Sequence, residues 1–288
     1  MAIIQKTFIE PKPTLYLVST PIGNMSDLTF RALEILKKVD YILAEDTRRA
    51  HKILEFYQFK NNLLSLYQYN EKQRVQKILS LLESGKEIAL ISDAGTPLIS
   101  DPGLLLVQEV KKAGFYVTSV PGPAAFLSAF SISSFDIPFL FLGFLPKNKK
   151  VKTEILLKHR FFEGSLIIYE SPLRIKDTLQ IVQMHYPQHN VSLSRELTKK
   201  FETIINGDID SVLLEELKTK GEYVLVIEGN KKSFSYQDFS LDEHIMFFVQ
   251  QGFSEKESFS KVAKVRNISK KEIYQKYKIQ KDNGIDNV

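Results

Sequence analysis

The chain has 288 residues, of which 43% are hydrophobic and 25% charged, a composition that leaves room for two folded domains and excludes wholesale disorder. It contains no cysteine, which excludes disulfide bonds, thiolate metal sites and a cysteine nucleophile. The net charge is only +5, but Lys and Arg are concentrated in residues 144–160 and 256–281, and the rest of the chain is acidic.

Residues 14–125 alternate between predicted strands and helices. Strands are expected at residues 15–18, 41–44, 88–91 and 117–120, and a helix from about Leu28. This order predicts an α/β fold in which a mainly parallel sheet is covered by helices on both faces. Ligands of such sheets bind at the carboxyl ends of the strands.

Three Gly/Pro-rich turns follow these strands directly: residues 19–24, 92–103 and 120–125. Proline fixes φ, and glycine lets the backbone approach a ligand closely, so such turns can bind a small molecule. None of them matches GxGxxG or GxxxxGK[ST]. They are either ordinary turns between strands and helices or a small-molecule site at one edge of the sheet, and their shared position favours a site.

Nothing in the chain predicts export or a membrane segment. The first thirteen residues, with Lys6 and Glu10, lack the apolar core of a secretory signal. Residues 116–135 carry no charge and could span a bilayer, but they contain Pro121-Gly122-Pro123 and several Ser and Thr. We expect a strand, a tight turn and a buried helix there, in a soluble, cytoplasmic protein with no membrane partner.

The lysine-rich segment after Pro146 is predicted to be the boundary to a second, mixed α/β domain. Strands are expected there at residues 166–169, 191–193 and 223–227, and helices near 172–185 and 208–219. The basic segment indicates either a polyanionic partner or a solvated linker.

The last fifty residues predict a small helical unit. A helix is expected over residues 241–250, and the Ser-x-x-Glu capping boxes at 254–257 and 269–272 each predict the start of another. The unit resembles a helix-turn-helix with a basic outer face, which indicates either nucleic-acid contact or packing alone.

Eight segments together resemble one family. In chain order they are LVSTPIGNMSDLTFRAL, AEDTRRA, ALISDAGTPLISDPG, VPGPAA, FLGFLP, YESPLRI, SRELTKKFE and GEYVLVIEG. The set, which runs from about Thr14 to Gly229, closely resembles the bacterial ribosomal small subunit methyltransferase I family of the tetrapyrrole methylase superfamily. One departure is Tyr69, where the family more often carries histidine, so no role that needs an imidazole is expected there.

The resemblance implies a tetrapyrrole-methylase-like fold with two α/β domains, 12–130 and 135–232, and a basic helical unit at 238–281. It implies S-adenosylmethionine bound in the cleft between the domains, usually in a homodimer. The implied reaction methylates the 2′-hydroxyl of a cytidine in the decoding region of 16S rRNA, on the RNA or the small subunit. By the same match, the residues against the cofactor are Pro21, Gly23, Ser92, Asp93, Thr96, Ala124, Ala125 and Tyr169.

Methyl transfer from a sulfonium needs the acceptor oxygen held in line, and it needs no metal from the protein. The five histidines are scattered and form no metal-binding motif, so no metal site is predicted. A ribose hydroxyl is a weak nucleophile, and a nearby carboxylate helps. We expect Glu45 or Asp46 to accept or orient its proton and Arg48 to hold a phosphate. The alternative is an acidic cluster at a helix start.

Basic residues of the second half and the tail are candidates for RNA contact. We expect Lys199 to be a catalytic residue. We expect Arg174 and Arg195 to contact phosphates of the RNA, and the alternative is an internal Arg–Glu pair that stabilises the domain. Lys147 and Lys149 of the first basic segment and Lys264 and Lys270 of the tail are further RNA-binding candidates.

Two other functions compete with this interpretation. An enzyme of the same fold could methylate carbon atoms of a tetrapyrrole, which leaves the EDTR, YESPLR and RELTKKFE segments and the basic helices unexplained. A non-enzymatic nucleic-acid-binding protein could use the tail alone, which leaves the three turns without a ligand.

Overall fold

The computed structural model describes residues 4–7, 9–67, 69–160, 162–187, 189–229, 240–250 and 252–283. Its first part contains β1 (Thr14–Val18), η1 (Met25–Asp27), α1 (Phe30–Lys38), β2 (Tyr41–Ala44), α2 (Thr47–Phe56), β3 (Asn62–Ser65), α3 (Glu71–Glu83), β4 (Ile88–Ile91), α4 (Leu104–Lys112) and β5 (Tyr116–Val120). Its second part contains α5 (Ala125–Ser133), β6 (Phe139–Phe144), α6 (Lys149–Lys158), β7 (Ser165–Glu170), α7 (Ile175–His185), β8 (Asn190–Arg195), β9 (Thr203–Asp208), α8 (Ile209–Leu214) and β10 (Tyr223–Ile227). The last helices are α9 (Leu241–Gln250), α10 (Glu255–Arg266) and α11 (Lys270–Asn283).

The first sheet is parallel throughout, with the strand order β3-β2-β4-β1-β5. Successive residues of a strand point to opposite faces, and in this sheet both faces are apolar. Ala89 and Ile91 pack with α1 and α2, whereas Ile88 and Leu90 pack with α3 and α4. This double burial explains why β4 is a continuous apolar run with every residue buried.

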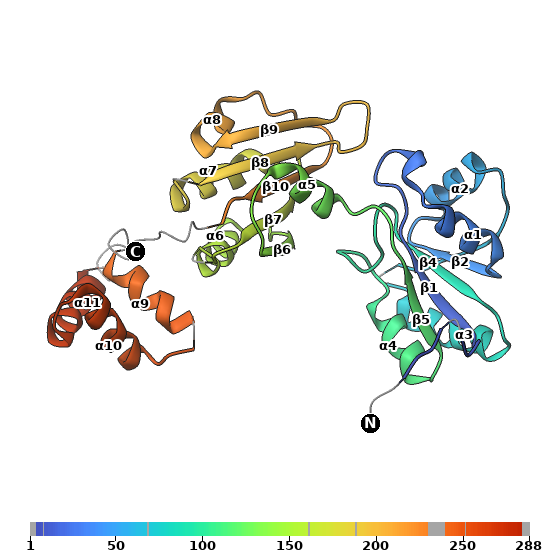
Figure 1. Ribbon diagram of the computed structural model, residues 1–288, viewed down its shortest axis with the longest axis horizontal. Helices are drawn as coiled ribbons and strands as arrows, with labels where there is room; N and C mark the ends of the chain where they lie inside the picture. The colour runs from blue at the N-terminus through green and yellow to red at the C-terminus, as the bar shows by residue number, and fades with distance from the viewer. Residues whose placement is uncertain are drawn as a thin grey trace.

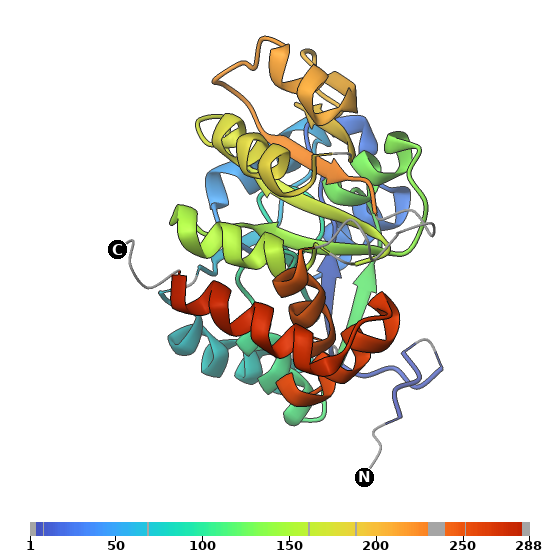
Figure 2. The same ribbon diagram turned by 90° about the vertical axis from the view of Figure 1, so that its left-hand side faces the viewer.

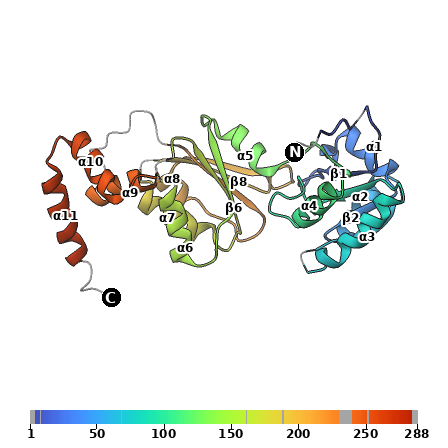
Figure 3. The ribbon, with the colours of Figure 1, turned by 90° about the horizontal axis from the view of Figure 1, so that it is seen from below.

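The second sheet has the order β6-β7-β10-β8-β9, with β6 and β7 parallel and the other pairs antiparallel. Helices α6, α7 and α8 bury one face, and α5 packs on the other against β7, β8 and β10. Both sheets with their helices confirm the predicted α/β class. The first and second sheets lie side by side along the long axis of the molecule (Figures 1 and 3).

The chain changes sheet earlier than the lysine-rich segment. Helix α5 already packs on the second sheet, and β6 pairs with β7 before Pro146 is reached. The lysine-rich segment is therefore no linker but the start of α6, which packs beside α7. Strands β3, β6 and β9 were not predicted from the sequence; β3 and β9 are edge strands that contain no fully buried residue and no continuous apolar run.

Helices α9, α10 and α11 pack on one another around Ile245, Val262 and Ile273. The predicted capping box is present at α10, where Ser254 and Glu257 satisfy each other's backbone N–H groups. An ion pair between Arg160 and Glu243 joins this helical unit to the end of α6. Figure 2, which looks along the long axis from that end, shows the unit nearest the viewer.

Residues 116–135 form β5, a Pro-Gly-Pro turn and α5, which confirms the predicted elements. The helix is less buried than expected, because only Ala129 and Ser133 of α5 are buried and Leu127 and Ile132 are exposed. Among the described helices, none combines the length and apolar character required to cross a membrane.

Candidate active site

A cavity of about 370 Å³ lies between the two sheets. The first sheet's side contributes Glu45, Arg49 and the loop residues 93–96 and 99–101. Ala124 and Ala125 line the cavity at the start of α5, where the chain passes from the first sheet to the second. The second sheet contributes Phe144, residues 169–172, Leu197 and residues 221–224, and Ile22 of the first turn lies among them. The cavity is therefore built from both halves of the chain.

The three Gly/Pro-rich turns are joined to one another by hydrogen bonds. Thr20 and Gly95 exchange two backbone bonds of 2.9 and 3.0 Å, in a pairing that places Gly95 at φ +83°. Thr96 Oγ1 lies 3.0 Å from Ser19 Oγ and donates to the Pro123 carbonyl at 3.2 Å. The turns that the sequence predicts at one edge are thus brought together there.

The predicted cofactor residues divide into two groups. Asp93, Thr96, Ala124, Ala125 and Tyr169 line the cavity. Pro21, Gly23 and Ser92 are not among the lining residues: the buried Ser92 hydroxyl donates to the Gly95 carbonyl at 2.9 Å, which supports the loop from behind. Gly23 lies against the second half of the chain, because a Cβ there would approach Lys199 Cγ to 2.4 Å.

Strained backbone gathers in the loops around the cavity. Leu98 and Ser100 have φ values of 69° and 73°, and Glu196 and Thr198 have 52° and 67°. Non-glycine residues in this region cost roughly 1–3 kcal/mol each and persist where the surrounding structure holds them, often at functional sites. Both loops therefore have the backbone signature of a site rather than of simple connections.

The wall formed by the first sheet is rich in carboxylates. Burial, together with Asp93, raises the pKa of Glu45. Burial raises the pKa of Asp101 to about 6, and the charges of Glu45 and Asp93 add to the rise. Among the lining residues that the structure describes, this wall has one cation, Arg49, whose Nε lies 3.4 Å from Asp93 Oδ2. Carboxylates in excess of cations can bind a cationic ligand, and a carboxylate with a raised pKa can itself accept a proton.

Asp101 was not singled out from the sequence. The signal available was the second Ser-Asp of SDAGTPLISDPG, which repeats the first within the same turn. Spacing alone does not show that both aspartates reach one cavity, because that depends on how the turn folds back.

Asp46 and Arg48 pair with each other instead of lining the cavity. Asp46 is the N-cap of α2, with Oδ1 accepting from the Arg48 backbone and side chain at 2.9 Å each. These bonds lower the pKa of Asp46 to about 2, and the Arg48 side chain is exposed. The geometry favours the helix-start interpretation for Asp46 and leaves Glu45 as the carboxylate that reaches the cavity.

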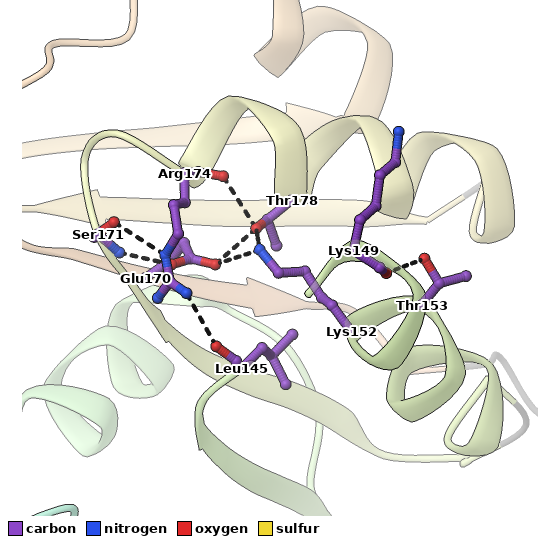
Figure 4. Close-up of polar contacts among 8 residues, drawn as sticks. All are labelled: Leu145, Lys149, Lys152, Thr153, Glu170, Ser171, Arg174 and Thr178. Atoms are coloured by element: carbon purple, nitrogen blue, oxygen red, sulfur yellow. Dashed lines mark hydrogen bonds and ion pairs between the residues drawn. The ribbon is translucent and has the colours of Figure 1, made fainter. Parts of the chain in front are cut away.

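Glu170, one of the lining residues of the second sheet, belongs to a polar cluster with Lys152, Arg174 and Thr178 (Figure 4). Glu170 is 1% exposed, and its Oε2 accepts from Lys152 Nζ at 2.9 Å and Thr178 Oγ1 at 2.7 Å. Its Oε1 accepts from the Ser171 backbone at 2.8 Å and pairs with Arg174 Nη2 at 2.6 Å.

Arg174 is thereby held inside the protein. Besides Glu170, it donates to the Leu145 carbonyl at 3.2 Å. The structure thus matches the alternative of an internal Arg–Glu pair at this position, rather than a free phosphate contact. Lys152, counted with the basic segment, is also internal, whereas the Lys149 side chain extends away from the cluster (Figure 4).

Lys199 also forms internal pairs, with Nζ 2.9 Å from both Glu196 Oε1 and Glu222 Oε2. Arg195 donates to the Lys220 carbonyl at 2.8 Å. Neither side chain is among the cavity's lining residues. Lys199 instead packs against Gly23, and this contact joins the RELTK loop to the first turn.

The four lysines expected to contact RNA are exposed, but they lie in two places. Lys147 and Lys149 follow the cavity residue Phe144 directly. Lys264 and Lys270 lie on α10 and α11, on the far side of the second sheet from the cavity (Figure 1). Among the described residues, no group of three or more His, Asp or Glu side chains is placed to hold a metal ion.

Comparison with known proteins identifies the class of protein to which this fold and cavity belong. The family model "Tetrapyrrole (Corrin/Porphyrin) Methylases" matches residues 14–213. Two solved structures share the fold: a uroporphyrin-III-C-methyltransferase from Thermus thermophilus (TM-score 0.51, 18% identity, 75% of this chain and 94% of that one) and a diphthine synthase (TM-score 0.58, 9% identity, 75% and 90%).

Closer relatives narrow the class. The protein named "Ribosomal RNA small subunit methyltransferase I" from Bacillus subtilis is 39% identical over 275 residues, which cover 92% of this chain and 94% of that protein. The protein of the same name from Escherichia coli O157:H7 is 38% identical over 273 residues, with coverage of 92% and 94%. The chain therefore belongs to the ribosomal RNA small subunit methyltransferase I family within the tetrapyrrole methylases.

Proposed function

We propose that this protein transfers a methyl group from S-adenosylmethionine to the 2′-hydroxyl of a cytidine in the decoding region of 16S rRNA. The observation that carries the proposal is the carboxylate-lined cavity between the two sheets, in a chain whose relatives are named as small-subunit rRNA methyltransferases. We further propose that it acts in the cytoplasm, where ribosomal subunits are assembled.

The cavity residues fit S-adenosylmethionine. The volume of the cavity is within the roughly 300–1,000 Å³ usual for small-molecule sites. Gly95 leaves room that a side chain would take, since a Cβ there would meet Ile22 and the Pro123 carbonyl. Burial is the main cause of the raised pKa of Asp101, and a cationic sulfonium would also relieve the repulsion that Glu45 and Asp93 add to it. Asp93, Thr96, Ala124, Ala125 and Tyr169 are the residues that we propose to hold this cofactor.

When bound, S-adenosylmethionine supplies an electrophilic methyl group. The chain's own contribution is to place the acceptor and manage its proton. Glu45 is the carboxylate that we assign to the ribose proton, because its raised pKa brings it closer to working pH. Asp93, held by Arg49 and by the Asp46 backbone N–H at 3.0 Å, lies beside it. The Tyr169 hydroxyl accepts from the Phe126 backbone at 3.1 Å, which fixes its ring in the wall.

We also propose that the protein is a homodimer, as the family resemblance implies. Apolar side chains that are about two-fifths exposed lie on α5 and on the edge strand β9, among them Leu127, Ile132 and Ile204. Light scattering of the purified protein tests this proposal by its mass: a monomer at micromolar concentration would contradict it.

The decisive experiment incubates the protein with isotopically labelled S-adenosylmethionine and small subunits that lack the modification. We expect label on one ribose of 16S rRNA, located by its resistance to alkaline cleavage. Naked 16S rRNA and a tetrapyrrole intermediate serve as parallel substrates. Label on the tetrapyrrole and none on either RNA substrate would replace this proposal with carbon methylation.

A further inference from the structure

Phe144 is a large aromatic residue placed in the wall of the cavity yet left largely open to solvent. It is the last residue of β6, it lines the cavity, and 58% of its surface is exposed. Its ring lies 5.4 Å from the Tyr169 ring at 58°. One side of the ring is thus supported by the wall, and the rest is available to a ligand.

A β-bulge accounts for this orientation. Along β6, Phe139 and Phe141 face α5, while Leu140 and Leu142 face the core of α6 and α7. Regular alternation would send Phe144 toward α6 and α7 as well. The register shift between Phe141 and Gly143 instead pairs Phe144 with Tyr169, on the cavity side. Bulges that redirect a side chain in this way are common beside functional sites.

Gly143 makes the bulge possible. Its φ is +64°, a conformation that glycine adopts without strain, and an added Cβ would lie 3.4 Å from Ser100 Oγ. The bulge therefore also brings β6 against the strained loop of the first sheet.

The residues after Phe144 are anchored from inside. Leu145 is 3% exposed, and its carbonyl accepts from Arg174, which Glu170 holds in turn. Lys152 completes the anchor by joining α6 to Glu170. Phe144 therefore projects from a fixed backbone, so that little ordering is needed when a ligand binds.

Positive charge follows the ring immediately. Lys147, Lys149 and Lys150 are exposed, and among the described residues no recorded ion pair involves them. An exposed aromatic face beside cations on a fixed backbone matches the chemistry of an unstacked nucleotide, which offers a flat base and charged phosphates.

We propose that Phe144 is the stacking surface for an unstacked nucleobase of the RNA substrate, with Lys147, Lys149 and Lys150 on the neighbouring phosphates. The proposal rests on the proposed function and adds to it the residue that receives the base. The competing occupant is the adenine of the methyl donor, which the test distinguishes.

The test compares Phe144→Ala with Phe144→Tyr, which keeps the ring, and with Phe56→Ala. Phe56 is a matched control, since it is 57% exposed at the end of α2 and is not a cavity residue. Loss of one stacked base is expected to raise the KM for small subunits roughly tenfold or more in Phe144→Ala. The tyrosine and Phe56 variants should remain within about twofold of the unsubstituted protein, and all melting temperatures should agree because the altered rings are exposed.

Two binding measurements complete the test without depending on turnover. Calorimetry with S-adenosylhomocysteine should give the same Kd for Phe144→Ala and the unsubstituted protein. Anisotropy with a single-stranded fragment of 16S rRNA should show weaker binding for Phe144→Ala alone. Weakened S-adenosylhomocysteine binding with unchanged RNA binding would assign Phe144 to the donor and overturn the proposal, as would no change in either. If the unsubstituted protein binds the RNA but never methylates it, the proposed function is wrong. The stacking proposal is then still decided by whether Phe144→Ala weakens RNA binding.

Discussion

Two groups of charged side chains lie at the cavity, and they differ in how completely their charges are paired. In the second sheet, the Glu170 carboxylate is buried and receives Lys152, Arg174, Thr178 and a backbone N–H. At the first sheet's edge, Glu45, Asp93 and Asp101 line the cavity, and Arg49, the one cation among the described lining residues, pairs with Asp93. The comparison shows that the Glu170 carboxylate is fully paired and supports the wall, whereas the carboxylates at the first sheet's edge outnumber their cation and can respond to a ligand.

The largest expected effect separates the two neighbouring acids at the first sheet's edge. Glu45→Gln removes the carboxylate that faces the cavity, and we expect kcat for methyl transfer to fall by roughly 10²–10⁴-fold. Asp46→Asn keeps an N-cap acceptor at α2 and should retain nearly full activity. Single-turnover assays on small subunits measure both variants, and equal activity of the two would remove Glu45 as the base.

The next effect concerns stability and belongs to the second sheet. Glu170→Ala leaves Lys152 and Arg174 without their shared counter-charge inside the protein, which we expect to cost about 3–5 kcal/mol of the free energy of unfolding. In Lys152→Met/Glu170→Gln, the buried lysine and carboxylate are both replaced by neutral side chains of similar size, so part of this loss should be recovered. Urea unfolding followed by circular dichroism compares the variants. A loss below about 1 kcal/mol for Glu170→Ala would contradict the role of the cluster as the wall's support.

Substitution of Asp101 is expected to raise the free energy of unfolding, by less than substitution of Glu170 lowers it. Its pKa is raised to about 6 in the folded protein, so the folded state binds this proton more tightly than the unfolded state. The associated stability is present below about pH 4 and is lost as the pH rises through about 6. Because the group is partly solvated, we expect Asp101→Asn to gain only about 1 kcal/mol at pH 8, and nothing at pH 4.

Thermal unfolding at the two pH values measures this gain. An equal change at pH 4 and pH 8 would contradict the assigned ionisation of Asp101.

The smallest effects concern the two sets of exposed lysines. Lys149→Ala and Lys264→Ala should each reduce the slope of log affinity against log salt by roughly 0.7–0.9 if the lysine contacts a phosphate. Neither change should alter stability, since both side chains are exposed. Filter binding of 16S rRNA at several salt concentrations measures the slopes. An unchanged slope for Lys264→Ala alone would restrict RNA binding to the side of the cavity.

Much of the site could be predicted because its turns are local and their strands are apolar. The three Gly/Pro-rich turns meet as expected. Five of the eight cofactor residues that the family resemblance implies line the cavity. Other predicted site residues do not reach a ligand site, because Lys199, Arg174 and Asp46 each form an ion pair with a neighbouring side chain. Sequence spacing identified these charges but could not say which of them would pair with the protein itself.

The sequence by itself determined the elements that depend on short-range patterns. Strands β2, β4 and β10 begin and end where predicted, because each is an apolar run bounded by polar or turn residues, and the Ser254–Glu257 box starts α10 through contacts within one turn. Only the tertiary structure decided which of two lysines three residues apart would be buried, and which carboxylates would share a cavity. Lys152 meets Glu170 from a different element, and Asp101 reaches Glu45 from a different loop. The pairing and desolvation of a charge depend on neighbours that are distant in the chain.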